Sequence, residues 1–137
     1  KNYYIKCDKE GQAMVYAEKG KEQESFIAFI EHALGILSAE NYSSFLAQFD
    51  SSRLSEQDLI LALRYLDETR PVLKVDNPVL VTNRYQEECL APFSDGGGFY
   101  LDYDLTTNGV GNDLTIQVEF LKEGDGYRVI LEDLHTL

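Results

Sequence analysis

Tryptophan is absent from this chain, and cysteine, methionine and proline are scarce, with two, one and three residues respectively. The two cysteines, Cys7 and Cys89, can form at most one disulfide bond. A chain of 137 residues buries enough surface to fold without such a bond, so we expect two reduced thiols. Because nothing in the sequence indicates an oxidising compartment, the expected location is the cytoplasm.

Long hydrophobic runs are also missing. None approaches the roughly 18–20 apolar residues that a transmembrane helix needs, so we expect no association with a membrane. Positive charge is scarce as well, because 12 Lys and Arg residues stand against 24 Asp and Glu residues, for a net charge of −12. Nucleic-acid binding requires a basic patch or stripe, so this composition argues against nucleic acid as a partner.

The residues that could carry chemistry form no recognisable motif. Neither His32 nor His135 lies at ligand spacing from a carboxylate cluster, and no calcium-loop signature is present. The glycines of 95–98 follow an aspartate and lead into a predicted strand, whereas a phosphate-binding loop opens a helix. We therefore predict no enzymatic activity, no cofactor and no metal site.

Negative charge is concentrated in the last third of the chain. Residues 85–137 contain eleven carboxylates and two bases, Lys122 and Arg128, whereas residues 1–84 contain thirteen acids and ten bases. The two parts therefore carry net charges of −9 and −3. A concentrated negative field attracts cationic partners and speeds their encounter.

The composition is typical of a globular protein, with 44% hydrophobic and 12% aromatic residues. The length predicts a single domain over residues 1–137. At its start, apolar and polar residues alternate over Tyr3–Cys7 and again over Ala13–Ala17, with turn residues between the two segments. This pattern predicts an N-terminal β-hairpin.

Three helices are expected after the hairpin. Apolar residues recur at helical spacing over residues 26–37 and again over 41–49. The third helix begins with a variant of the capping box, in which Ser55 is the cap and Asp58 replaces the usual Glu or Gln. Its predicted apolar face extends as far as Leu66.

Three consecutive antiparallel strands are predicted over residues 99–134. Apolar and polar residues alternate through all three segments, which are separated by glycine-containing turns. Such alternation indicates a sheet with one buried face and one solvated face. We expect the helices to cover the apolar face, which includes Leu101, Val118, Phe120, Val129 and Leu131. The predicted fold class is α+β.

Pairing these strands gathers carboxylates on the solvated face. The expected neighbours are Asp102 with Gln117, Asp104 with Thr115, Gln117 with Glu132, and Glu119 with Ile130. We define the acidic face by its expected members, which are Tyr100, Asp102, Asp104, Glu119 and Glu132. Three interpretations compete for it: a solvated surface, a docking surface for a cationic protein, and a catalytic or metal site. The catalytic or metal site is the least supported of the three, because the sequence lacks the nucleophile, base and ligand patterns that such a site requires.

The chain resembles the small acidic immunity proteins that bacteria encode beside toxins. The resemblance lies in its size, its pI near 4.4, the lack of a catalytic motif and the stretches 42–50, 52–55 and 66–76. It implies a protein that binds and neutralises a cationic toxin, for example a nuclease whose nucleic-acid groove it covers. Immunity families differ in fold, so the resemblance implies no particular site residues.

Charge and resemblance together predict that a basic protein, such as a cognate toxin, binds the acidic face. Its carboxylates, Asp102, Asp104, Glu119 and Glu132, would steer the partner during association. Tyr100 and Tyr85 are the predicted aromatic anchors. The alternative is a small-ligand module with an apolar pocket between the helices and the sheet.

Overall fold

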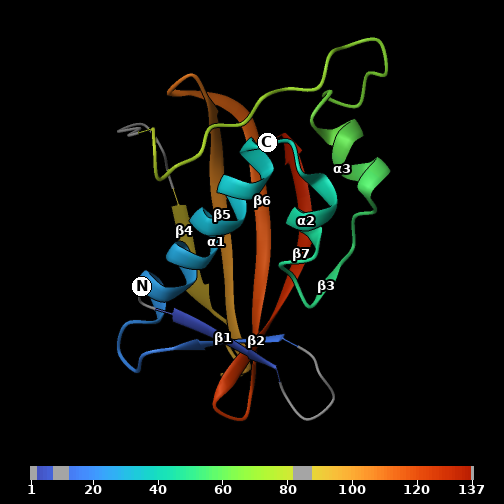
Figure 1. The fold of residues 1–137 in the computed structure, drawn as a ribbon. Coiled ribbons are helices and arrows are strands. Elements are labelled where there is room, and N and C mark those ends of the chain that lie inside the picture. The colour runs from blue at the N-terminus through green and yellow to red at the C-terminus, as the bar shows by residue number, and fades with distance from the viewer. Residues whose placement is uncertain (1–2, 8–12, 82–87, 137) are drawn as a thin grey trace.

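The computed structural model describes residues 3–7, 13–81 and 88–136, and the side chains of 14–81 and 90–136. The two cysteine thiols lie outside this part. Three helices and a curled sheet in the described ranges confirm the α+β class (Figure 1). The helices are α1 (Glu22–Ser38), α2 (Tyr42–Leu46) and α3 (Glu56–Ala62). The strands are β1 (Tyr3–Cys7), β2 (Ala13–Ala17), β3 (Ser51–Ser52), β4 (Glu88–Pro92), β5 (Gly98–Thr107), β6 (Val110–Glu123) and β7 (Gly126–Thr136).

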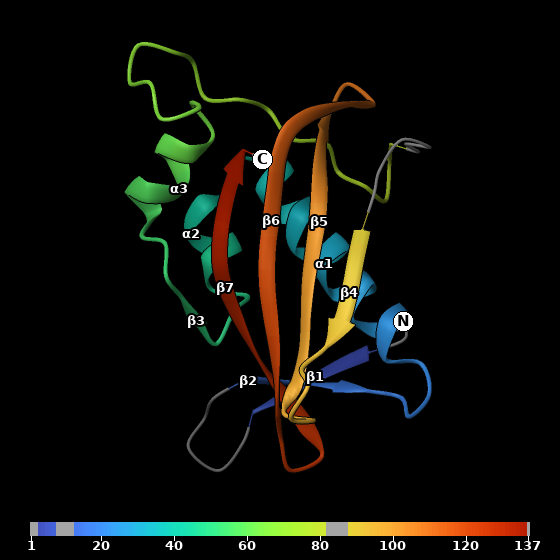
Figure 2. The same ribbon diagram turned by 180° about the vertical axis from the view of Figure 1, so that it is seen from behind.

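These strands form one sheet in the order β1-β2-β7-β6-β5-β4, with β3 added beside β7. Strand β3 runs parallel to β7, and the other pairs are antiparallel. Strands β5, β6 and β7 run along the length of the molecule, while β1 and β2 cross one end of it (Figures 1 and 2). The sequence analysis missed β3, whose two residues are too few for an alternation, and β4, where Cys89, Leu90 and Ala91 follow one another without a polar residue between them.

The pairing within the long strands matches three of the predicted neighbours. These are Asp102 with Gln117, Asp104 with Thr115, and Glu119 with Ile130. The predicted pair of Gln117 with Glu132 is wrong, because the register of β6 and β7 shifts between Gln117 and Val118. Gln117 instead lies opposite Asp133, so that Glu132 is the extra residue of a β-bulge.

Helix α1 covers one face of the sheet through a cluster of aromatic rings (Figure 1). The Phe26 ring stacks on Phe120 of β6 with 4.0 Å between the centroids, and Tyr127 of β7 meets Phe26 edge-on at 4.9 Å. The five strand residues predicted to be buried are all buried. From behind, Figure 2 shows that none of the described helices lies over the opposite face of β4 to β7.

Helix α2 is shorter than the predicted segment 41–49. Beyond Leu46 the amides of Gln48 and Phe49 donate to carbonyls three residues back, so the chain continues as turns with the tighter spacing of a 3₁₀-helix. Phe49 is nevertheless buried, with its ring 5.2 Å from that of Phe45. The apolar spacing therefore identified the buried residues correctly, although the helix ends earlier.

Helix α3 begins at the predicted capping box. The Ser55 hydroxyl accepts a hydrogen bond from the Asp58 amide at 3.1 Å, and the Asp58 carboxylate accepts one from the Ser55 amide at 3.0 Å. The helix ends at Ala62, because Tyr65 and Leu66 adopt left-handed conformations with φ of 54° and 60°. Leu66 is therefore 76% exposed, and its predicted place on a buried helix face is wrong.

Candidate functional site

The acidic face lies on the side of the sheet that the described helices leave open (Figure 2). Four of its members line one depression of about 320 Å³. This acidic hollow is lined by Phe93, Tyr100, Asp102, Gln117, Val118, Glu119 and Glu132. Strand β5 supplies Tyr100 and Asp102, β6 supplies Glu119 and β7 supplies Glu132. Tyr85 lies outside the described residues.

Asp104 stands beside the acidic hollow rather than in it. It lies two positions beyond Asp102 on β5, where its Oδ1 accepts a hydrogen bond from the Thr115 hydroxyl at 2.8 Å. The alternation of side chains along β5 places it on the same face as Tyr100 and Asp102. Asp104 therefore adds to the negative field around the hollow without lining it.

Two carboxyl groups, those of Glu119 and Glu132, lie side by side in the acidic hollow. Burial raises the pKa of Glu119 above its usual value. Glu132 raises that pKa further, both by repulsion and through a hydrogen bond that requires one of the two groups to keep a proton. The positive charge of Arg53 opposes these effects only in part. Glu119 therefore holds its proton more firmly than an isolated glutamate does.

The two oxygens of Glu132 have different surroundings. Its Oε2 forms an ion pair with Nε of Arg53, whose side chain is 71% exposed. Its Oε1 is buried, and no group in the described part of the chain donates a hydrogen bond to it. A buried acceptor without a donor is costly to the fold.

An aromatic pair forms one wall of the acidic hollow. The rings of Phe93 and Tyr100 lie 5.9 Å apart and are inclined by 36°. The face of an aromatic ring attracts cations, and Tyr100 is 40% exposed, so its ring is accessible to a partner. Rings beside carboxylates are a combination suited to an ammonium or guanidinium group.

Arg128, the second base near this face, is neutralised within the protein. Its Nε and Nη2 donate to the two oxygens of Glu123 at 2.7 and 3.2 Å, and its Nη1 lies 3.5 Å from Oδ1 of Asp50. The Arg128 side chain is only 9% exposed. It therefore offers little positive charge to a partner approaching the acidic face.

The described residues give no support to a metal centre. Within them, no group of three or more His, Cys, Asp or Glu side chains is arranged to hold a metal ion. The helices among them also include none that is long and apolar enough to span a membrane.

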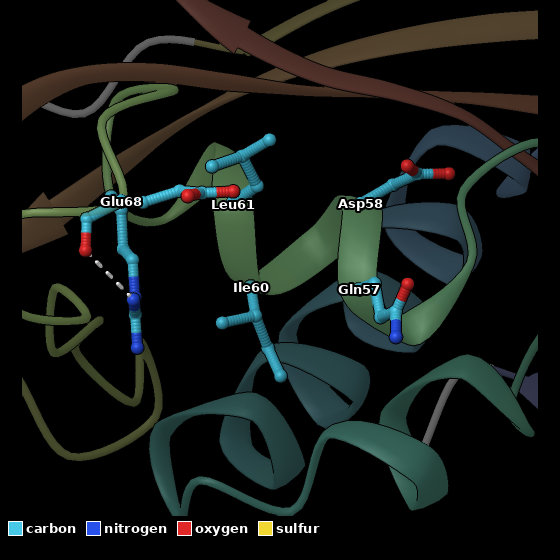
Figure 3. A pocket seen from close by; sticks show the side chains of 6 residues that line it. Gln57, Asp58, Ile60, Leu61 and Glu68 are labelled. Atoms are coloured by element: carbon cyan, nitrogen blue, oxygen red, sulfur yellow. Dashed lines mark hydrogen bonds between the residues drawn. The ribbon is translucent and has the colours of Figure 1, made fainter.

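Two further cavities are lined by none of the residues that the sequence analysis assigned to a site. The larger, about 620 Å³, lies on α3 and the turn that follows it (Figure 3). Its lining residues are Gln57, Asp58, Ile60, Leu61, Arg64 and Glu68, and Nη1 of Arg64 donates to the Glu68 carbonyl at 3.2 Å. Because one short segment supplies every wall, no second element of the fold holds this hollow in shape.

The smaller cavity, about 290 Å³, lies between α3 and the ends of β6 and β7. We call it the edge pocket, and its lining residues are Ala62, Tyr65, Leu66, Leu114, Asp133, Leu134, His135 and Thr136. Helix α3 lies beside the end of β7 in Figure 2. Segments more than 40 residues apart in the sequence meet here, which is why no local motif revealed the pocket.

Residues 37–137 match a family described as a domain of unknown function, DUF7668. The chain belongs to this family. The matched segment contains every residue of the acidic hollow and of the edge pocket, whereas β1, β2 and nearly all of α1 lie outside it. No curated protein and no solved structure matches the chain.

Proposed function

We propose that this protein binds and neutralises a basic protein, such as a bacterial toxin, by covering the partner's cationic surface with the acidic face. The observation that carries the proposal is the Glu119–Glu132 carboxyl pair, which lines the acidic hollow together with Asp102 and Tyr100. A cationic side chain from a partner would donate hydrogen bonds to the carboxylates that line the hollow and would balance their charge.

The proposed complex forms around one lysine or arginine of the partner. Its charged group enters the acidic hollow and lies between Glu119 and Glu132, against the ring of Tyr100. Binding there favours the ionised form of Glu119, so affinity increases as the pH rises through the raised pKa of this residue. Asp102, which also lines the hollow, adds a further acceptor.

The wider field of the C-terminal part would govern the rate of association. Residues 85–137 carry a net charge of −9, and such a field speeds the encounter with a basic protein at low salt. The effect should weaken as the Debye length falls from about 10 Å at 0.1 M salt to about 3 Å at 1 M. The affinity left at high salt then reports the anchoring in the hollow. We place this encounter in the cytoplasm.

A charge-reversal experiment tests the proposal. Lysine replaces Asp102, Asp104, Glu119 and Glu132 together, and the association rate is measured with a partner identified by pull-down from the native host and then purified. The matched control has the same change in net charge at four exposed glutamates away from the acidic face, which are Glu18, Glu40, Glu56 and Glu68.

We expect the acidic-face variant to associate at least about tenfold more slowly at low salt and to lose its salt dependence. The control variant should retain most of the association rate of the original protein. Equal rates for both variants would show that only net charge matters. An association rate unchanged from the original protein would show that the acidic face is a solvated surface.

A second candidate function, binding of a small ligand, is supported by the edge pocket. This cavity lies between a helix and the sheet, and its lining combines buried apolar residues with a few polar groups. Small-molecule sites in proteins have this composition. The two functions use different surfaces, because the edge pocket shares no lining residue with the acidic hollow.

A further inference from the structure

The turn between β5 and β6 contains a chemically labile pair of residues. Asn108 is followed by Gly109, and no other asparagine in the sequence is followed by glycine. Asparagine is among the residues that degrade on heating, and a following glycine favours this reaction because it has no side chain to hinder the approach of its backbone nitrogen. Asn108 is exposed, so water reaches it. The turn therefore holds every group that a spontaneous deamidation requires.

The reaction has two steps and consumes only water. In the first step the backbone nitrogen of Gly109 bonds to Cγ of Asn108, and the bond from Cγ to the side-chain nitrogen breaks. That nitrogen leaves as ammonia, with the proton that the Gly109 amide has lost. Water then opens the five-membered imide at one of its two carbonyls, which gives either aspartate or isoaspartate. Both products carry a carboxylate in place of a neutral amide.

One carboxylate opposes the first step by holding the amides on both sides of the Asn108 Cα atom. The Asn108 amide donates to Oδ1 of Asp76 at 2.9 Å, and the Gly109 amide donates to Oδ2 at 2.8 Å. Ring closure requires rotation about the bond from Cα to the carbonyl carbon of Asn108, which turns one amide relative to the other and breaks at least one hydrogen bond. Removing the Gly109 proton would also place a second negative charge beside Asp76.

The Asp76 carboxylate is itself fixed in place. The Asp76 amide donates to the Thr106 carbonyl at 2.9 Å, and the Thr106 hydroxyl donates to Oδ2 of Asp76 at 2.8 Å. The Lys74 carbonyl accepts a hydrogen bond from the Thr107 hydroxyl at 2.6 Å, and Val75 is only 3% exposed. Figures 1 and 2 show this segment after α3 passing beside the end of β5 and β6. Asp76 therefore leaves the turn only when the segment around Val75 leaves the core.

We propose that Asn108 is a modification site that Asp76 keeps unreactive in the folded protein, and that Asn108 converts to aspartate or isoaspartate once Asp76 has separated from the turn. The proposal is independent of the acidic hollow and of the edge pocket, because neither is lined by Asp76 or Asn108.

Conversion of Asn108 opposes the return of Asp76 to the turn. Either product adds a carboxylate to the turn that binds Asp76, and like charges repel. Isoaspartate also lengthens the main chain by one atom. Only Asn108 and Gly109 lie between the paired residues Thr107 and Val110, and the length of such a short turn sets the register of its strands. The modified turn therefore retains an irreversible record that the segment was released.

The rate of conversion tests the proposal. The full chain and the Asp76→Ala variant are incubated at physiological temperature and pH, and Asn108 is followed by peptide mapping with mass spectrometry, which detects the gain in mass when an amide becomes a carboxylate. Enzymatic methylation of isoaspartyl groups measures the second product. We expect Asp76→Ala to convert about tenfold faster than the original protein, the factor expected for the loss of a hydrogen bond to a charged group.

Two further samples separate the effect of Asp76 from a general loss of stability. Leu131→Ala removes a fully buried side chain and leaves every hydrogen bond of the turn in place, so its Asn108 should convert as slowly as in the original protein. The original chain unfolded in concentrated urea gives the rate of the unrestrained site, which should exceed that of the folded protein by at least about tenfold.

Each contrary result overturns a stated part of the proposal. Equal rates in Asp76→Ala and the original protein would show that the carboxylate does not restrain the turn. Equal acceleration in Asp76→Ala and Leu131→Ala would assign the effect to unfolding of the whole protein. If Asn108 remains unchanged even in the urea-unfolded chain, it is not a modification site.

Discussion

Asp76 and Gly109 are 33 positions apart, and Oδ2 of the aspartate accepts a hydrogen bond from the glycine amide at 2.8 Å. The same carboxylate accepts hydrogen bonds from the Thr106 hydroxyl at 2.8 Å and the Asn108 amide at 2.9 Å. Asn108 and Gly109 form the turn between β5 and β6, with φ of 54° and 78°. One carboxylate therefore connects the irregular segment after α3 to the turn between β5 and β6.

We predict that Asp76→Ala lowers the free energy of unfolding by about 1–3 kcal/mol at pH 7, because it leaves the donors on Thr106, Asn108 and Gly109 without their acceptor. Burial alone would raise the pKa of Asp76, but the three hydrogen bonds outweigh it and hold the pKa below its usual value. This stabilisation is therefore present above the unfolded pKa of about 3.9 and is lost as the pH falls through the lower folded pKa.

Urea unfolding at pH 7 and at successively lower pH checks this prediction. The difference in the free energy of unfolding between the original protein and Asp76→Ala should be largest at neutral pH and should decrease as the pH is lowered. Asp125→Ala, in the exposed turn between β6 and β7, serves as the control and should cost little. If the difference in unfolding free energy does not depend on pH, the charge of the Asp76 carboxylate contributes nothing to stability.

Glu119→Gln should have the opposite effect on stability. The raised pKa of Glu119 reflects burial and the neighbouring carboxyl group of Glu132, so ionising it costs free energy in the folded state. We expect the variant to be more stable at pH 7 by about 0.5–1 kcal/mol, the scale of a partly exposed charge pair. The wild-type residue stabilises the fold only while protonated, so the variant's advantage should appear as the pH rises through the raised pKa.

Thermal unfolding of both proteins between pH 4 and pH 8 tests this prediction. Glu40→Gln, at an exposed position, controls for the loss of one negative charge. A Glu119→Gln variant that is less stable than the original protein at neutral pH would contradict the proposed carboxyl pair.

Tyr65→Phe removes only the hydroxyl group that donates to the Asn112 carbonyl at 2.6 Å. We expect a loss of about 0.5–1.5 kcal/mol, the usual net value of one hydrogen bond, because the ring and its contact with Arg70 remain. Chemical denaturation measures the change. Tyr100→Phe on the open face is the matched control and should change stability much less, whereas equal effects would show that the hydroxyl does not anchor the turn.

Leu131→Ala should cost about 2–5 kcal/mol, because the side chain is fully buried between the sheet and the helices and its loss leaves a cavity. Val110→Ala, at a position that is 64% exposed, should change stability by no more than about 0.5 kcal/mol. Denaturant midpoints for the two variants provide the comparison. A small loss for Leu131→Ala would mean that the core closes around the missing side chain.

Local sequence patterns were sufficient to predict those structural features that depend on residues close together in the chain. The period-two alternation placed Leu101, Val118 and Leu131 on the buried face, since any slip by one residue would have exposed the whole apolar row. The capping box located the start of α3, because Ser55 and Asp58 satisfy each other's amides within one turn of helix. No such local rule marked the end of α3, where Tyr65 and Leu66 occupy positions that usually require glycine.

The amino-acid sequence by itself determined the α+β class, the buried face of the long strands and the accumulation of carboxylates on the opposite face. These features follow from the spacing of apolar residues along the chain and from the amino-acid composition. Both can be read from the sequence without knowledge of the tertiary structure. Only the tertiary structure decided that Glu132 lies in a β-bulge, that it shares a hollow with Glu119, and that Leu66 and His135 line one pocket. Each of these depends on contacts between distant segments, whose geometry is set by packing and register rather than by neighbouring residues in the chain.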